Sequence, residues 1–146
     1  YVRIGVLGLS LGGAVAICTV AQRRAADVAA LCTWSSVPSF AFWRREPDPV
    51  LLDPQNCHCV GRHFFHDRPA VDVPAAYTSL HCPRLQIQGD ADLPGFRAGF
   101  AEYFRVAPPP KRHVVIPGAD HVFTQTRHRR RVIRLTVDFF ARWLAR

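Results

Sequence analysis

The sequence has no methionine, a single lysine and no long apolar run. No stretch approaches the ~20 apolar residues of a membrane-spanning helix, and residues 1–4 lack the pattern that opens a signal peptide. The five cysteines are odd in number and lack the regular spacing of a secreted disulfide framework, which favours a reducing, cytoplasmic location. Because translation starts with methionine, its absence at position 1 predicts a chain that begins inside a longer protein or has lost its initiator.

The composition indicates one globular domain. Of the 146 residues, 49% are hydrophobic and 21% are charged, which excludes a disordered or fibrous chain. The formal charge is +8, and the densest cationic cluster covers residues 127–131. This cluster opens a segment with apolar residues at helical spacing, so we interpret it as the solvated face of a helix. No basic groove interleaved with aromatic residues accompanies it, and we expect no nucleic-acid partner.

Short apolar runs alternate with helical patterns along most of the chain. Strands are predicted over residues 2–7, 28–34, 84–88 and 112–116, and helices over residues 11–22, 95–105 and about 125–145. This alternation predicts an α/β fold with about four parallel strands flanked by helices. Residues 35–77 are rich in proline and predict a lid-like excursion with short helical pieces.

The most informative motif is a Gly-x-Ser-x-Gly turn at residues 8–12, directly after the first strand and before the first helix. In this context a serine side chain is presented as a nucleophile from a sharp, strained turn. We expect side chains at Gly8 and Gly12 to collide with the flanking strand and helix. The motif also predicts an acid and then a histidine further along the chain.

Both expected residues follow, each just after a predicted strand. The acid lies in Gln88-Gly89-Asp90-Ala91-Asp92, and the histidine in Gly118-Ala119-Asp120-His121. Asp90 and Asp92 both remain candidates for the acid at this point; the resemblance described below implies Asp92, with Asp90 as a turn former. His121 is favoured over His113, because a histidine at the start of a strand more often packs or faces solvent. Asp120 is interpreted as a turn or capping residue.

In these three motifs the chain resembles the C-terminal half of the α/β-hydrolase fold family, of the esterase, lipase and serine-aminopeptidase type. The resemblance covers nearly the whole chain, least securely residues 35–77. It implies Ser10 as nucleophile, His121 as general base and then acid, and Asp92 as the residue that orients the imidazole. It implies Leu11 N–H as one oxyanion donor, and a hydrolase that acts without a cofactor on an ester, thioester or amide through an acyl-enzyme.

The chain departs from this family at its start. The family supplies further strands before the serine and a second oxyanion donor from a loop between them. We therefore expect residues 1–146 to be an N-terminally truncated hydrolase domain with little activity alone. Its first strand is expected to be an unpaired edge with exposed apolar surface, open to a missing N-terminal segment or to self-association.

Two alternative functions remain open at this stage. One is a non-catalytic hydrolase fragment. The other is a dinucleotide-binding module, but residues 4–12 lack the Gly-x-Gly-x-x-Gly spacing, and the second strand ends in Ser35-Ser36 instead of an acidic residue for the ribose.

The excursion contains two further features of interest. Thiolates and imidazoles are zinc ligands, so Cys57-His58-Cys59 with His63, His66 and Asp67 suggests a zinc hypothesis; against it, Cys-x-Cys departs from the usual ligand spacing and the sequence has no second cysteine pair to complete the site. We therefore expect no metal. Aromatic residues of the excursion and of the strand before it either line an acyl pocket or pack in the core; they are Trp34, Phe40, Phe42, Trp43, Phe64 and Phe65.

Overall fold

The computed structural model describes residues 3–22, 28–40, 50–53, 58–60, 71–93 and 95–145, with the backbone alone in 50–53 and 58–60. The main strands are β1 (Ile4–Leu9), β2 (Val28–Trp34), β5 (Arg84–Gly89) and β6 (Lys111–Ile116). The main helices are α1 (Leu11–Gln22), α3 (Val73–Thr78), α4 (Phe96–Val106) and α5 (Thr126–Leu144). These elements confirm the predicted α/β fold. The first strand ends later than predicted, because β1 pairs with β2 as far as Leu9 and Trp34.

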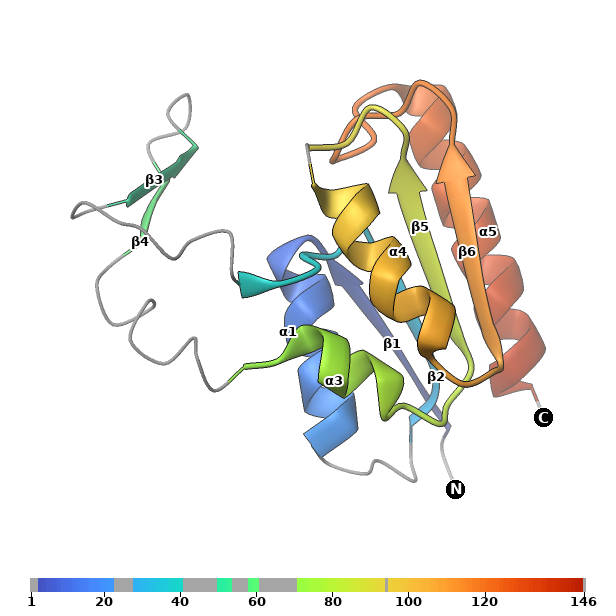
Figure 1. Ribbon diagram of the computed structural model, residues 1–146. Helices are drawn as coiled ribbons and strands as arrows, with labels where there is room; N and C mark the ends of the chain where they lie inside the picture. The colour runs from blue at the N-terminus through green and yellow to red at the C-terminus, as the bar shows by residue number, and fades with distance from the viewer. Residues whose placement is uncertain are drawn as a thin grey trace.

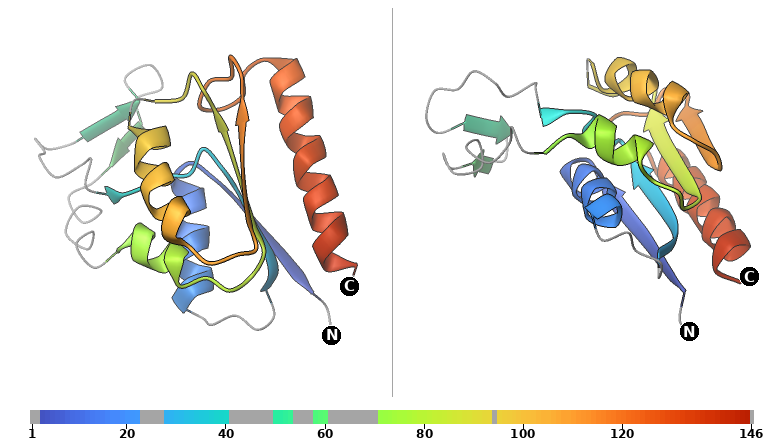
Figure 2. Two further views of the ribbon diagram at one scale, coloured as in Figure 1. Left: turned by 45° about the vertical axis from the view of Figure 1, so that its right-hand side comes forward. Right: turned by 60° about the horizontal axis from the view of Figure 1, so that its bottom comes forward.

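The strands form one four-stranded sheet in the order β1-β2-β5-β6, and all three pairings are parallel. Helices α1, α3 and α4 cover one face of this sheet, and α5 covers the other (Figures 1 and 2). Because the strands are parallel, their carboxyl ends meet at one edge of the sheet. Open α/β sheets place their functional sites at that edge.

Two apolar cores lie on opposite faces of the sheet. The first packs α1, α3 and α4 against β2, and its buried residues include Ile17, Leu31, Tyr77 and Phe100. The second packs α5 against β2, β5 and β6. All six residues of β5 are buried, because the strand lies inside the sheet and is covered on both faces.

The excursion contains one of the predicted short helical pieces, α3. It also contains two strands that were not predicted, β3 (Val50–Asp53) and β4 (His58–Val60), which pair antiparallel. The backbone of His58 and Cys59 lies in β4, whereas the other predicted zinc candidates lie outside the described residues: Cys57, His63, His66 and Asp67. Within the described ranges, no three His, Cys, Asp or Glu side chains form a group that could hold a metal ion.

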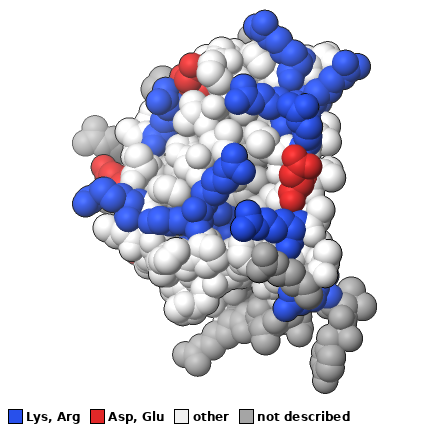
Figure 3. Space-filling view, turned by 90° about the vertical axis from the view of Figure 1, so that its right-hand side faces the viewer, with Lys and Arg blue, Asp and Glu red and all other residues white. Residues whose placement is uncertain are grey.

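The arginine cluster begins α5. Its arginines are exposed, while His128 is buried beneath them. Figure 3 shows Lys and Arg side chains spread over the face of the molecule on this side. None of the described helices is long and apolar enough to span a membrane.

Candidate active site

Ser10 occupies the turn between β1 and α1 and has a φ of 52°. This left-handed conformation is uncommon for a residue with a side chain and is typical of a strained functional turn. The turn is held by its backbone. Ser10 N–H donates to the carbonyl of Trp34 at 2.9 Å, and Ser10 C=O accepts from the N–H groups of Gly13 and Val37 at 3.0 and 3.1 Å. The serine is therefore fixed to the end of β2 and to the segment after it.

The glycines around the serine differ in what they permit. A Cβ at Gly8 would lie 2.3 Å from the carbonyl oxygen of Gly12, as the motif predicts. The same expectation for Gly12 is wrong, since a Cβ there would meet nothing within 4 Å. The second close approach is instead at Gly13, where a Cβ would lie 2.8 Å from the side chain of Ser36.

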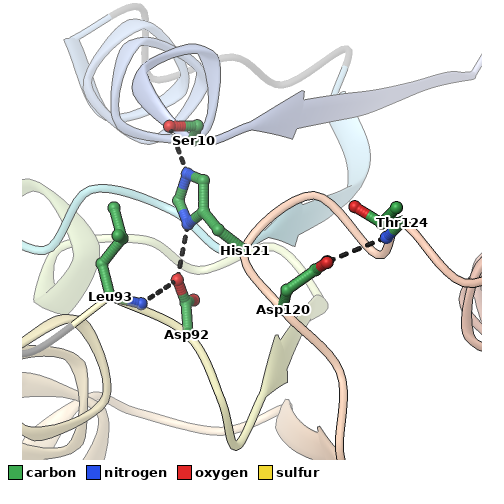
Figure 4. Close-up of polar contacts among 6 residues, drawn as sticks. All are labelled: Ser10, Asp92, Leu93, Asp120, His121 and Thr124. Carbon is green, nitrogen blue, oxygen red and sulfur yellow. Dashed lines mark hydrogen bonds and ion pairs between the residues drawn. The ribbon is translucent and has the colours of Figure 1, made fainter. Parts of the chain in front are cut away.

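The acid and the histidine approach the serine from the carboxyl ends of β5 and β6. His121 Nε2 lies 2.8 Å from Ser10 Oγ, and His121 Nδ1 lies 2.5 Å from Asp92 Oδ1 (Figure 4). An ionised carboxylate only accepts hydrogen bonds, so Nδ1 carries the proton that faces Asp92. Nε2 is then an acceptor for the Ser10 hydroxyl, which is the arrangement a general base requires.

Burial differs along this chain of hydrogen bonds. The Asp92 side chain is 0% exposed and the His121 side chain 19% exposed. Asp92 Oδ1 also accepts from Leu93 N–H at 2.7 Å (Figure 4). Its Oδ2 is buried and has no partner within the described residues. The carboxylate is thus held from two sides through a single oxygen.

An aromatic contact not anticipated from the sequence supports the imidazole. The ring of Phe96, at the start of α4, lies edge-to-face with His121 at 5.0 Å between centroids. The sequence gives no local signal of such a contact, because the approach of α4 to the histidine loop is set by tertiary packing.

The alternative histidine, His113, has partners away from Ser10 and Asp92. The ring of His113 packs against those of Phe100 and Phe104, and its Nε2 lies 3.0 Å from Gln88 Oε1. Desolvation and then the nearby Arg97 lower the pKa of His113, which favours its neutral form.

The two other aspartates each bind a backbone N–H group. Asp120 Oδ1 accepts from Thr124 N–H at 2.8 Å (Figure 4), in agreement with its interpretation as a turn residue. The pKa of Asp120 is lowered, chiefly by the hydrogen bond from the Thr124 backbone. Asp90 Oδ1 accepts from Gly118 N–H at 2.5 Å, across to the histidine loop.

Leu11 begins α1 directly after the serine. The first N–H groups of a helix lack partners within the helix, and the helix dipole adds positive potential at that end. Leu11 N–H is the first of the N-terminal N–H groups of α1. Two of the six aromatic residues predicted to line a pocket or pack in the core lie in the described part of the chain: Phe40 packs against the first core and Trp34 against the second. The other four, Phe42, Trp43, Phe64 and Phe65, lie outside the described residues.

Comparisons with known proteins establish the fold. No family model matches the chain, and no curated protein matches its sequence. Among solved structures, an esterase domain from a Rhodothermus marinus protein aligns with a TM-score of 0.78 and 20% identity over 96% of this chain and 61% of its own. Dienelactone hydrolase from Anabaena variabilis aligns with a TM-score of 0.68 and 24% identity over 97% and 50%.

A third solved structure, Est1E from Butyrivibrio proteoclasticus, aligns with a TM-score of 0.75 and 18% identity over 95% of this chain and 62% of its own. The chain therefore spans about half to three-fifths of the length of these structures. At such identities the similarity concerns the fold, and the arrangement of strands and helices in this chain is that of the α/β hydrolases.

Proposed function

We propose that this chain, which has the α/β-hydrolase fold, is a serine hydrolase of the carboxylesterase type with Ser10, His121 and Asp92 as its catalytic triad. The observation that carries the proposal is the continuous hydrogen-bonded chain from Ser10 Oγ through both imidazole nitrogens to Asp92. Hydrolase and esterase structures among those of similar fold add support. The substrate class is an ester, thioester or amide, and the reaction needs no cofactor.

In the proposed reaction, Ser10 Oγ attacks the acyl carbon while His121 Nε2 takes the hydroxyl proton. The resulting oxyanion is stabilised by Leu11 N–H at the start of α1. The imidazolium, held by Asp92, then gives its proton to the leaving alcohol, thiol or amine. Water attacks the acyl-enzyme with His121 again as base, releasing the acid and restoring the serine.

The test is labelling by a fluorophosphonate, which reacts with activated serines, together with hydrolysis of p-nitrophenyl acetate. We expect labelling to map to Ser10, to vanish in Ser10→Ala and to fall sharply in His121→Ala. A folded wild-type chain that neither reacts with the probe nor hydrolyses the ester would favour the alternative, a non-catalytic hydrolase fragment. Reaction of the Ser10→Ala variant at the wild-type rate would refute the assignment of the nucleophile.

The open edge of β1 bears on how much activity this chain has. In the described sheet β1 is an edge strand, and Ile4, Leu7 and Leu9 are 47%, 47% and 41% exposed. Val6 packs against the first core while Gly5 faces Phe140 of α5, so Leu7 and Leu9 lie on the α5 side by strand alternation. Ile133 and Val137 of α5 are exposed as well, at 46% and 58%. A free edge with apolar surface on this scale is a template for pairing.

We further propose that residues 1–146 are part of a longer hydrolase domain, in which a preceding strand pairs with β1 and its loop supplies the second oxyanion donor. The greater length of the structures with this fold supports the proposal. Adding the residues encoded upstream is expected to raise the labelling rate of Ser10 by about a hundredfold to a thousandfold, because removal of one oxyanion donor typically lowers the reaction rate by that factor. A dimer of this chain that dissociates in Leu7→Lys would point instead to self-association.

We also propose a reducing, cytoplasmic location. Cys18, Cys32 and Cys82 are free thiols. Burial raises the pKa of Cys32 to about 11, so the thiol stays protonated and unreactive.

A further inference from the structure

Besides the contact between His121 and Asp92, three hydrogen bonds join the segments that carry these two residues. Two are between backbone groups: Asp90 N–H donates to Ile116 C=O at 3.3 Å, and Ala91 N–H donates to Ala119 C=O at 3.1 Å. The third uses a side chain, since Asp90 Oδ1 accepts from Gly118 N–H at 2.5 Å. Asp90 thus contributes to both the backbone and the side-chain part of the junction.

The two loops touch so closely at this junction that no side chain fits between them. A Cβ at Gly89 would lie 1.9 Å from the carbonyl oxygen of Ala119 and 3.0 Å from that of Asp120. Gly118 has a φ of 71°, a left-handed conformation that presents its N–H to the Asp90 carboxylate. A hydrogen bond from N–H to an ionised carboxylate is stronger than a neutral one. The Asp90 side chain therefore holds the histidine loop at a residue with left-handed backbone conformation.

This junction lies a few residues from the catalytic contact. Asp92 follows Asp90 by two positions and His121 follows Gly118 by three, so the junction sets the separation of the backbone segments that carry both side chains. Within the described part of the chain, Asp90 forms hydrogen bonds with Gly118, Ile116 and Arg97, and none with Ser10 or His121. Asp90 therefore acts through the histidine loop and does not take part in the chemistry itself.

We propose that Asp90 is a positioning residue: its carboxylate holds Gly118, and through it the histidine loop, so that His121 Nδ1 meets Asp92 Oδ1. The consequence for catalysis rests on the proposed hydrolase function. The geometric part does not, because the hydrogen bond between His121 and Asp92 is measurable without a substrate.

The experiment compares Asp90→Ala, Asp90→Asn and a matched control, Asp72→Ala. Asp72 Oδ1 also accepts from a backbone N–H, that of Ala75 at 2.9 Å, but at the start of α3. Three quantities are measured for each: kcat and KM for p-nitrophenyl acetate, the free energy of unfolding in urea, and the downfield proton resonance of His121 Nδ1–H by NMR in the cold.

We expect Asp90→Ala to lower kcat about 10- to 100-fold, the scale of a small misplacement of reacting groups, with KM within twofold. The His121 resonance is expected to weaken or move upfield. Asp90→Asn keeps an oxygen acceptor and is expected to restore most of kcat and the resonance. Asp72→Ala is expected to lose comparable stability with neither effect.

Two results would overturn the proposal: an unchanged His121 resonance in Asp90→Ala, or an equal loss of resonance and kcat in Asp72→Ala. Absence of the resonance from the wild-type chain would overturn it too, since the contact it depends on would not exist. If the wild type shows the resonance but has no hydrolytic activity, the proposed function fails, and the comparison of resonances still decides the role of Asp90.

Discussion

The two outer glycines of the Gly-x-Ser-x-Gly turn are predicted to respond in opposite ways to alanine. In Gly8→Ala the new methyl group would lie 2.3 Å from the Gly12 carbonyl oxygen and 2.7 Å from Gly13 Cα. These are backbone atoms of the first turn of α1, so relief requires moving the turn that holds Ser10. Overpacking typically costs about 1–3 kcal/mol, and a clash with backbone belongs at the upper end of that range. Gly12→Ala places its methyl group in open space on an exposed helical position.

For Gly12→Ala the expected change is a gain of about 0.5–1 kcal/mol, because alanine loses less backbone entropy than glycine in a helix. Urea denaturation of both variants measures the free energy of unfolding, and the rate of fluorophosphonate labelling reports on the serine. We expect Gly8→Ala to be destabilised and slow to label. If Gly8→Ala is as stable as the wild type, or Gly12→Ala is destabilised by more than about 1 kcal/mol, the described packing of the turn is wrong.

Three further predictions concern strain, pH and a buried cation. Ser10→Gly and Ser10→Ala both lose labelling, but Ser10→Gly is expected to be more stable in urea by about 1 kcal/mol because glycine relieves the positive φ; equal stabilities would argue against strain at this position. Burial lowers the pKa of His113 in the folded state, so the unfolded chain binds more protons. The free energy of unfolding should therefore fall as the pH drops below about 6.5, and the fall should be smaller in His113→Leu. Arg84 is 2% exposed and donates to the carbonyls of Leu80, Cys82 and Pro108. Arg84→Met should therefore lower the free energy of unfolding in urea by about 1–3 kcal/mol and keep the wild-type labelling rate. A loss of labelling in the folded variant would contradict this.

Most of the fold follows from local patterns in the sequence. The predicted bounds of β2 and α1 coincide with those of the structure, because an apolar run and a helical pattern are each bounded by residues of different character. The end of β1 was predicted too early, since its length depends on pairing with β2. The strands β3 and β4 were not predicted, because a short strand is defined by its partner and not by its own sequence.

For the candidate site, the three motifs together with the family resemblance selected a serine, an acid and a histidine that lie within hydrogen-bonding distance of one another. The packing of individual residues around the site could not be predicted from the sequence. The motif cannot tell that Gly13 and not Gly12 is closely packed, because its neighbour Ser36 comes from the loop after β2. Likewise, the link from Asp90 to Gly118 joins residues 28 positions apart, so nothing local distinguishes it from an ordinary turn.

The start of α5 has an electrostatic consequence of its own. Its first turn holds no acidic residue, and exposed arginines at 127, 129, 130 and 131 lie where the helix dipole is already positive. These charges repel one another and the end of the helix, which follows the histidine loop directly. Dissolved salt screens such exposed charges, with a Debye length of about 10 Å at 0.1 M. Ionic strength therefore acts on this helix as a stabiliser, and dilute buffer is the condition under which its first turn frays.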